Sequence, residues 1–124
     1  MKKLNQQGDD LNPKITFDDS TSTLRIEGRS IPLEVDQFFS ETIQWLEQYA
    51  ENPNDHTKLE IDLKYMIGKS VRSLLMLLYK LKSINDSGKS VNVEWYVPQG
   101  ADDLKDLSEE LLANLHIPHD IRSN

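Results

Sequence analysis

The chain has 124 residues, a formal net charge of −7 and no cysteine. That length suits one hydrophobic core and is too short for two. The acidic balance disfavours binding to a nucleic-acid backbone, and the lack of cysteine excludes disulfides and thiolate metal sites. No apolar stretch approaches the roughly 20 residues that span a bilayer. We therefore expect a cytoplasmic protein that binds neither nucleic acid nor a membrane.

The first part of the chain predicts an arm followed by a β-hairpin. Residues 1–12 are polar and are expected to form a flexible arm, so that a single domain covers residues 13–124. Apolar and polar residues alternate over residues 14–17 and again over residues 24–27, as in half-buried strands. The segment between them is rich in turn-forming residues, which predicts an antiparallel pair.

The middle of the chain predicts two helices and two strands. Apolar residues spaced by three and four predict a first helix from about 34–36 to 50, and a second, more apolar helix spans about 69–84. Residues 59–65 and 91–97 alternate as strands. The unit from 59 to 97 is therefore expected to be a right-handed β-α-β crossover with parallel strands.

The last part predicts a third amphipathic helix over residues 102–115 and a short edge strand over 117–121. The fold class is then α/β, with an N-terminal β-hairpin, a β-α-β unit and a mixed sheet over which about three helices pack.

Catalytic and metal-binding patterns are weak in this sequence. His116 and His119 have no third ligand in view, so two surface histidines are the simpler interpretation. The acidic pairs at 102–103 and 109–110 suit a helix start and a solvated helix face. We expect no cofactor, no metal and no enzymatic activity.

The segment of residues 65–73 joins the clearest strand to the most apolar helix. Ser70 falls near the start of that helix, where a hydroxyl can cap free amide groups. The same position suits a phosphate, because the helix N-terminus is positive and Lys69 and Arg72 are close in sequence. Capping and phosphorylation are therefore both open interpretations.

Five motifs stand in a fixed order along the chain. They are Gly28-Arg29-Ser30-Ile31-Pro32, then Phe38-Phe39 with Trp45-Leu46-x-x-Tyr49, Leu63-x-Tyr65, Val93-x-Trp95-Tyr96 and the acidic pair Asp102-Asp103. With these motifs the chain resembles the SiaC family of bacterial regulatory phosphoproteins over roughly residues 13–121.

The resemblance implies a STAS-like domain, similar to anti-sigma-factor antagonists, that acts as a non-enzymatic switch. It also implies phosphorylation by a cognate kinase, reversal by a phosphatase, and control of a diguanylate cyclase, hence of cyclic-di-GMP signalling and biofilm formation. In the family an Asn-Thr pair follows the tyrosine of the strand, and the threonine accepts the phosphate. Here Ile67 and Gly68 stand in those positions, and Leu33 follows Pro32 where the family has glutamate. Ser70 matches a family serine two places later and is the remaining candidate acceptor.

Our leading hypothesis is a regulatory protein that docks on a signalling enzyme through the start of the second helix and the neighbouring first helix. The candidate binding residues are Arg29, Ser30, Tyr65, Gly68, Lys69, Arg72 and Ser73. Two alternatives remain open. One is a small enzyme or ligand-binding domain with a pocket near Tyr65, Trp95 and Tyr96, and the other is a self-associating structural domain.

Overall fold

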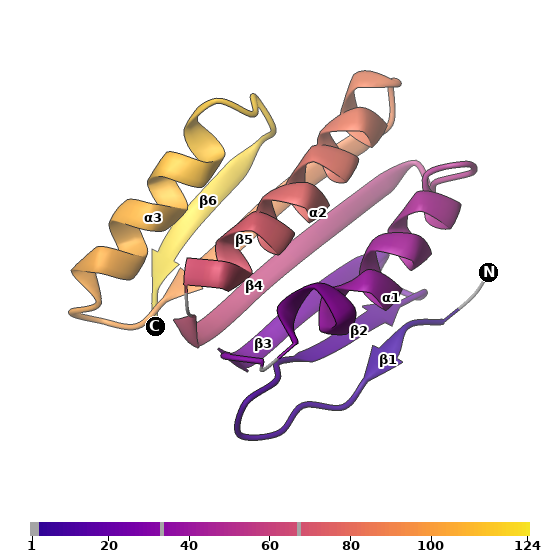
Figure 1. Cartoon of the computed structure of the whole chain (residues 1–124). Helices are drawn as coiled ribbons and strands as arrows, with labels where there is room; N and C mark the ends of the chain where they lie inside the picture. Colours follow the sequence, from indigo (N-terminus) through magenta and orange to yellow (C-terminus); the bar gives the residue numbers. More distant parts are fainter. Residues whose placement is uncertain (1–2, 33, 67) are drawn as a thin grey trace.

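The computed structural model describes residues 3–32, 34–66 and 68–124. Ile67 and Leu33, at which the sequence departs from the family pattern, lie outside these ranges. In chain order the elements are β1 (Asn5–Gln6), β2 (Lys14–Asp18), β3 (Thr23–Ser30), α1 (Val35–Tyr49), β4 (His56–Met66), α2 (Gly68–Asp86), β5 (Ser90–Val97), α3 (Asp102–Ala113) and β6 (His119–Ser123). Figure 1 shows their arrangement.

The strands form a mixed sheet in which neighbours in sequence are neighbours in space. Within the described residues the order is β1-β2-β3-β4-β5-β6. β2 pairs antiparallel with β1 and β3, which confirms the hairpin, whereas β3, β4, β5 and β6 run parallel to one another. The predicted parallel pairing across α2 is confirmed. Two further parallel connections, across α1 and across α3, were not predicted.

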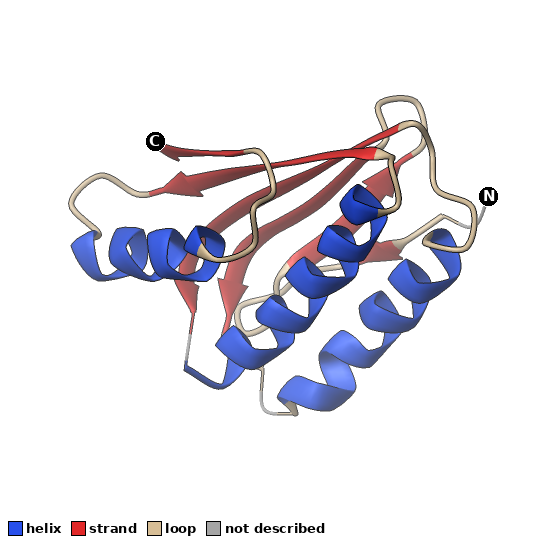
Figure 2. Ribbon diagram, turned by 90° about the horizontal axis from the view of Figure 1, so that it is seen from above, coloured by secondary structure: helices blue, strands red, loops and turns tan. Residues whose placement is uncertain are grey.

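The predicted packing of about three helices over a mixed sheet is confirmed, and in the described structure α1, α2 and α3 all lie on one face of it (Figure 2). The alternation within the strands explains this, because Leu59, Ile61 and Leu63 of β4 all turn toward the helices and are buried. α1 adds an aromatic group in which Trp45 and Tyr49 stack at 5.2 Å and Phe17 of β2 packs on both. The core is thus a single layer between the sheet and the helices.

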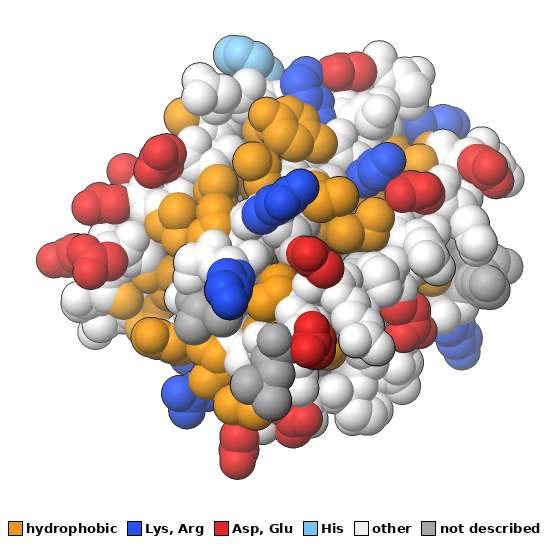
Figure 3. All heavy atoms as spheres, in the orientation of Figure 1, with side chains coloured by type: hydrophobic (Ala, Val, Ile, Leu, Met, Phe, Trp, Pro, Cys, Tyr) orange, Lys and Arg blue, Asp and Glu red, His pale blue; other side chains and the backbone are white. Residues whose placement is uncertain are grey.

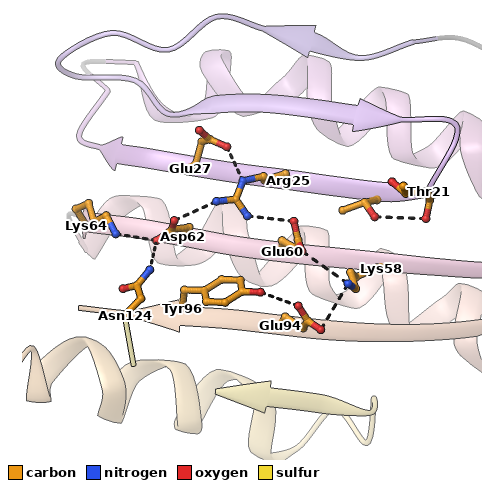
Figure 4. A network of polar contacts seen from close by, with 11 residues as sticks. Thr21, Arg25, Glu27, Lys58, Glu60, Asp62, Lys64, Glu94, Tyr96 and Asn124 are labelled. Atoms are coloured by element: carbon orange, nitrogen blue, oxygen red, sulfur yellow. Dashed lines mark hydrogen bonds and ion pairs between the residues drawn. The ribbon is translucent and has the colours of Figure 1, made fainter. Parts of the chain in front are cut away.

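The opposite face of the sheet carries a charged network (Figure 4). At its centre Arg25 pairs with Glu27, with Glu60 at 3.0 Å and with Asp62 at 3.1 Å. Partial burial alone would lower the pKa of the Arg25 guanidinium, but its hydrogen bonds to the carboxylates outweigh burial and raise it. The charged side chains at alternate positions of neighbouring strands therefore form ion pairs with one another on this face of the sheet.

Residues 3–12, the described part of the segment expected to be a flexible arm, are packed against the rest of the fold. Leu4 is buried, and β1 extends the sheet beside β2. Gln6 accepts a 2.6 Å hydrogen bond from Thr42 of α1. Leu4 and Gln6, together with the backbone pairing to β2, hold this segment against the sheet and α1, although its polar composition favoured a loose arm.

Candidate functional site

The predicted site residues lie at the end of the sheet where β3 and β4 finish and α2 begins. The carboxyl ends of parallel strands lie at the same end of the sheet, and binding sites of α/β proteins are commonly found there. Arg29 pairs with Tyr65 across the two strands, and Ser30 pairs with Met66. A β-bulge after Gly28 skips Lys64 in this register, which changes the direction of the last residues of β4.

Ser30 and Ser70 join the end of β3 to the first turn of α2. The Ser30 hydroxyl donates to the Ser70 oxygen at 2.9 Å, and the Ser70 hydroxyl donates to the Ser30 carbonyl at 3.1 Å. Both residues are buried, with Ser70 only 1% exposed, and Ser73 one turn later is 2% exposed. The three candidate serines therefore belong to the packing beneath the surface, and the Ser70 hydroxyl is directed at β3.

The other candidate residues are exposed and lie around the hydrogen-bonded pair of Ser30 and Ser70. The guanidinium of Arg29 lies 5.8 Å from the centre of the Tyr65 ring, and Tyr65 is 52% exposed. Lys69 and Arg72 of α2 are exposed as well. Because Ser30 contacts Ser70, Arg29 and Lys69 belong to the same end of the sheet, although alternation along β3 turns the Arg29 side chain toward Tyr65 and away from the face on which the two serines meet. We call Arg29, Lys69 and Arg72 the basic corner.

The basic corner is distinguished by charges that the protein leaves unpaired. Within the described part of the chain, none of its members forms an ion pair, whereas most other lysines and arginines do. Carboxylates are abundant in a chain with a net charge of −7, yet three of the five described cations without an ion pair stand at this end of the sheet, the other two being Lys3 and Lys14. The charges of the basic corner remain available to another molecule.

Gly68 is the first residue of α2 and is exposed. A Cβ atom built on it would meet no heavy atom within 4 Å, and its backbone is outside the left-handed region. Glycine is therefore not required there by space or by conformation. A residue with a hydroxyl would fit the same position and would point into solvent.

The side chains of Arg72 and Ser73 face α1 across a shallow groove. This groove has a volume of about 380 Å³, and Ile43 and Met76 contribute apolar surface to it. The side chain of Met76 is 43% exposed, which is high for a large apolar residue on the side of α2 that faces α1. The predicted participation of the first helix thus has a geometric counterpart in this groove.

The alternative pocket near Tyr65, Trp95 and Tyr96 is contradicted for Trp95 and Tyr96, which lie on opposite faces of the sheet. Adjacent residues of a strand face opposite sides of the sheet, so Trp95 is fully buried under the helices, whereas Tyr96 bonds to Glu94 on the charged face. Tyr65 lies beyond Ile61, the partner of Trp95 in the register. The three aromatic side chains do not converge.

A cavity does lie beside Tyr65, larger than the groove at α1, but its other walls were not predicted. It lies between the end of β4 and the start of α3 and has a volume of about 610 Å³. Its lining consists of Lys64, Tyr65, Met66, Gly100, Ala101, Asp102, Asp103, Leu104 and Leu107. The turn at 98–100 before an amphipathic helix was a usable signal, but only the fold brings it next to β4.

The described part of the chain shows neither a metal-binding cluster nor a membrane-spanning helix. Among the described residues, no group of three or more histidine, aspartate or glutamate side chains is arranged to hold a metal ion. His119 bonds through Nδ1 to the carbonyl of Ile117 at 2.8 Å. None of the helices in the described ranges is long and apolar enough to cross a membrane.

Comparison with known proteins extends over the whole fold. The family model described as SiaC family regulatory phosphoprotein matches residues 6–123. The solved structure of SiaC of Pseudomonas aeruginosa superimposes with a TM-score of 0.91 at 22% identity, covering 100% of both chains. A chain in the crystal structure of the diguanylate cyclase SiaD in complex with its activator SiaC, from the same species, gives a TM-score of 0.89 at 22% identity over 98% of this chain and 99% of that one.

A curated relative agrees in length. An uncharacterized protein of Pseudomonas aeruginosa strain UCBPP-PA14 is 23% identical over 100% of this chain and 98% of its own. The structural likenesses establish the fold, including the six-stranded mixed sheet and its three helices.

Proposed function

Because the chain belongs to the SiaC family of regulatory phosphoproteins, we propose that it is a non-enzymatic cytoplasmic regulator that docks on a diguanylate cyclase and so acts in cyclic-di-GMP signalling and biofilm control. The observation that carries the proposal is the basic corner, whose three cations are exposed and unpaired in the described structure of an acidic chain. A solved relative, SiaC, activates the cyclase SiaD in a complex.

The chemistry of the corner supports docking over catalysis. Arginine and tyrosine are the side chains that most often dominate binding energy at protein interfaces, and here Arg29 covers an exposed Tyr65 ring. The unpaired cations would speed association with an acidic surface of the partner. Among the described residues, the corner offers cations and an aromatic ring but no nucleophile next to a base, as acyl transfer would need.

We propose that this docking does not depend on phosphorylation at the start of α2. Gly68 has no hydroxyl, and the hydroxyls of Ser30, Ser70 and Ser73 are buried. A cognate kinase and phosphatase would act on Ser70 only after the first turn of α2 separates from β3, which breaks both hydrogen bonds between the two serines. The absence of an exposed hydroxyl at position 68 supports a permanently docking-competent form.

The direct test mixes the purified chain with a diguanylate cyclase from the same organism and measures binding by calorimetry and cyclic-di-GMP synthesis. We expect a complex and a change in synthesis rate. Lys69→Glu should weaken the complex by about tenfold, as loss of a charge contact at an interface does. The matched control is Lys89→Glu, at the opposite end of the sheet, which should leave affinity unchanged.

Two results would contradict the proposal. One is the absence of any complex with each diguanylate cyclase of the organism. The other is equal weakening by Lys69→Glu and Lys89→Glu, which would show a response to net charge rather than to a site. Intact-mass measurement of the protein from its host tests the phosphorylation proposal separately, because a phosphate on Ser70 would overturn independence from phosphorylation and leave docking intact.

A further inference from the structure

α3 stands apart from the other two helices. α1 packs against α2, whereas α3 packs mainly on β5 and β6 (Figures 1 and 2). Hydrophobic side chains gather between α2 and α3 and continue toward the end of β4 (Figure 3). In globular proteins a helix normally buries its whole apolar stripe, yet Leu104, Leu107 and Leu111 of α3 are each only partly buried.

The cavity beside Tyr65 is the part of this surface nearest to the basic corner. Met66, Ala101, Leu104 and Leu107 supply apolar walls, and the exposed side chain of Tyr65 borders it. Its volume of about 610 Å³ exceeds what one side chain fills and lies in the range of sites that take a ligand or several side chains. We call it the α3 groove.

The α3 side of the groove's rim is acidic, whereas Lys64 on the β4 side is already paired with Asp62. Asp102 and Asp103 line the α3 side, and Asp106 follows one turn later on the same helix. All three are exposed, and within the described residues none of them forms an ion pair. An apolar groove with unpaired carboxylates at its edge is complementary to an apolar segment flanked by cations.

We infer that the α3 groove binds an amphipathic helix of the partner, with apolar side chains inserted between β4 and α3 and lysine or arginine residues beside Asp102 and Asp103. This inference rests on the proposed function and deepens it by stating the chemistry of the partner. Apolar anchors spaced by three and four residues suit such a groove. Together with the basic corner, the groove gives the docking surface opposite charges at its two ends, which fixes the direction of the bound segment.

A helix fits the groove better than the other occupants. A small polar ligand needs convergent buried polar groups, but the charged side chains lining the groove are the exposed residues Lys64, Asp102 and Asp103. An added β-strand needs a free sheet edge, and the strand beneath the groove, β4, is paired on both sides. Side chains of a partner helix inserted between β4 and α3 need neither buried polar groups nor a free strand edge.

The experiment uses two probes and a pair of matched variants. The probes are the cyclase and a fluorescently labelled amphipathic peptide of leucine and lysine, each titrated with the full chain. Asp102→Lys/Asp103→Lys reverses the rim, and Glu109→Lys/Glu110→Lys makes the same change in net charge on exposed positions of the same helix. We expect the rim variant to weaken both probes by about tenfold and the control to change affinity less than about twofold.

A second variant and a mapping experiment complete the test. Leu107→Asn removes apolar wall and should weaken the peptide at any salt concentration, whereas the effect of the rim variant should shrink as salt rises. Amide shifts of the labelled chain on peptide addition should be concentrated at residues 64–66 and 100–107. Melting curves verify that each variant is folded.

The outcomes separate the two proposals. If the cyclase binds but the rim variant binds it as well as the control does, the α3 groove inference is overturned and the proposed function stands. If the cyclase does not bind while the peptide binds selectively at the groove, the cyclase assignment fails and the helix-binding groove stands. Peptide binding that is weakened equally by both variants, or shifts that map elsewhere, would also overturn the inference.

Discussion

Ser30 and Ser70 exchange hydrogen bonds in a buried pair, with the Ser30 hydroxyl donating to Ser70 Oγ at 2.9 Å and the Ser70 hydroxyl donating to the Ser30 carbonyl at 3.1 Å. This pair fixes the first turn of α2 to the end of β3 and so positions the basic corner. It also removes the one candidate phosphate acceptor at this corner from solvent.

Ser70→Ala should destabilise the protein because it leaves the buried Ser30 hydroxyl without its acceptor. The expected loss in the free energy of unfolding is about 1–3 kcal/mol, as for a buried polar group deprived of its partner. Urea denaturation measures it. Ser40→Ala is the control, since the Ser40 hydroxyl bonds to the carbonyl of Gln37 on an exposed helix surface and its loss should cost less than about 0.5 kcal/mol. Equal losses in the two variants would show that the buried pair contributes nothing specific.

Gly68→Thr should be tolerated, whereas Gly88→Thr should not. A Cβ atom meets nothing within 4 Å at either glycine, but Gly88 has φ +105° and Gly68 is helical. The left-handed backbone at Gly88 should cost a β-branched residue about 1–2 kcal/mol, and the helical position should cost nothing or gain slightly. Thermal unfolding of the two variants gives the comparison. A loss at position 68 as large as that at position 88 would mean that glycine is required at the start of α2.

Gly68→Thr also places a hydroxyl on the exposed surface at the family's acceptor position. Incubated with a cognate kinase, the variant should gain a phosphate that the parent chain does not gain at this corner. Intact-mass spectrometry reads the result, and Asn52→Thr, at an exposed bend after α1 with an ordinary backbone, is the control. If the variant gains no phosphate, the missing hydroxyl is not what separates this chain from a phosphorylation switch.

The charged face of the sheet should make stability depend on pH in the acid range. The hydrogen bond from the Tyr96 hydroxyl is the main cause that lowers the pKa of Glu94 below its ordinary value of 4.5, and the charges of Lys58 and Arg122 add to it. A carboxyl with a depressed folded pKa stabilises the protein above its unfolded value, and that contribution is lost as pH falls through the folded pKa.

Glu94→Gln should therefore flatten the decline of stability below pH 4.5 and lower stability at neutral pH. The measurement is the free energy of unfolding as a function of pH. Glu110→Gln serves as the control, because within the described residues Glu110 is exposed and forms no ion pair. Identical acid profiles for the two variants would show that the network around Glu94 does not couple to folding.

The sequence predicted the elements well because their signals are local. The alternation of β4 and the apolar face of α1 each depend on periodicity within one segment, and the strand and helix expected over those segments are confirmed. The pairing of strands that are distant in sequence leaves no such local signal. The parallel pairing of β3 with β4 depends on how α1 packs, so only the hairpin partner of β3 was predicted from the sequence.

The candidate site was predicted in part for the same reason. Resemblance to the family placed attention on the start of α2, and the tie between Ser30 and Ser70 brings Arg29 of β3 to that corner. The sequence could not show that Ser70 is buried, because its burial depends on the packing of α2 against the end of β3. Nor could it show the α3 groove, whose walls come from segments more than thirty residues apart.

The N-terminal segment offers the sharpest test of the corrected fold. Leu4 is 3% exposed and packs in the core, whereas Leu11 in the same polar stretch is 39% exposed. Leu4→Ala should lower the free energy of unfolding by about 2–4 kcal/mol, the range for a buried leucine, and Leu11→Ala should change it by less than about 0.5 kcal/mol. Urea denaturation of both variants makes the comparison with the same side-chain change. If both changes are small, residues 1–12 behave as the loose arm that their composition suggested, and the sheet begins functionally at β2.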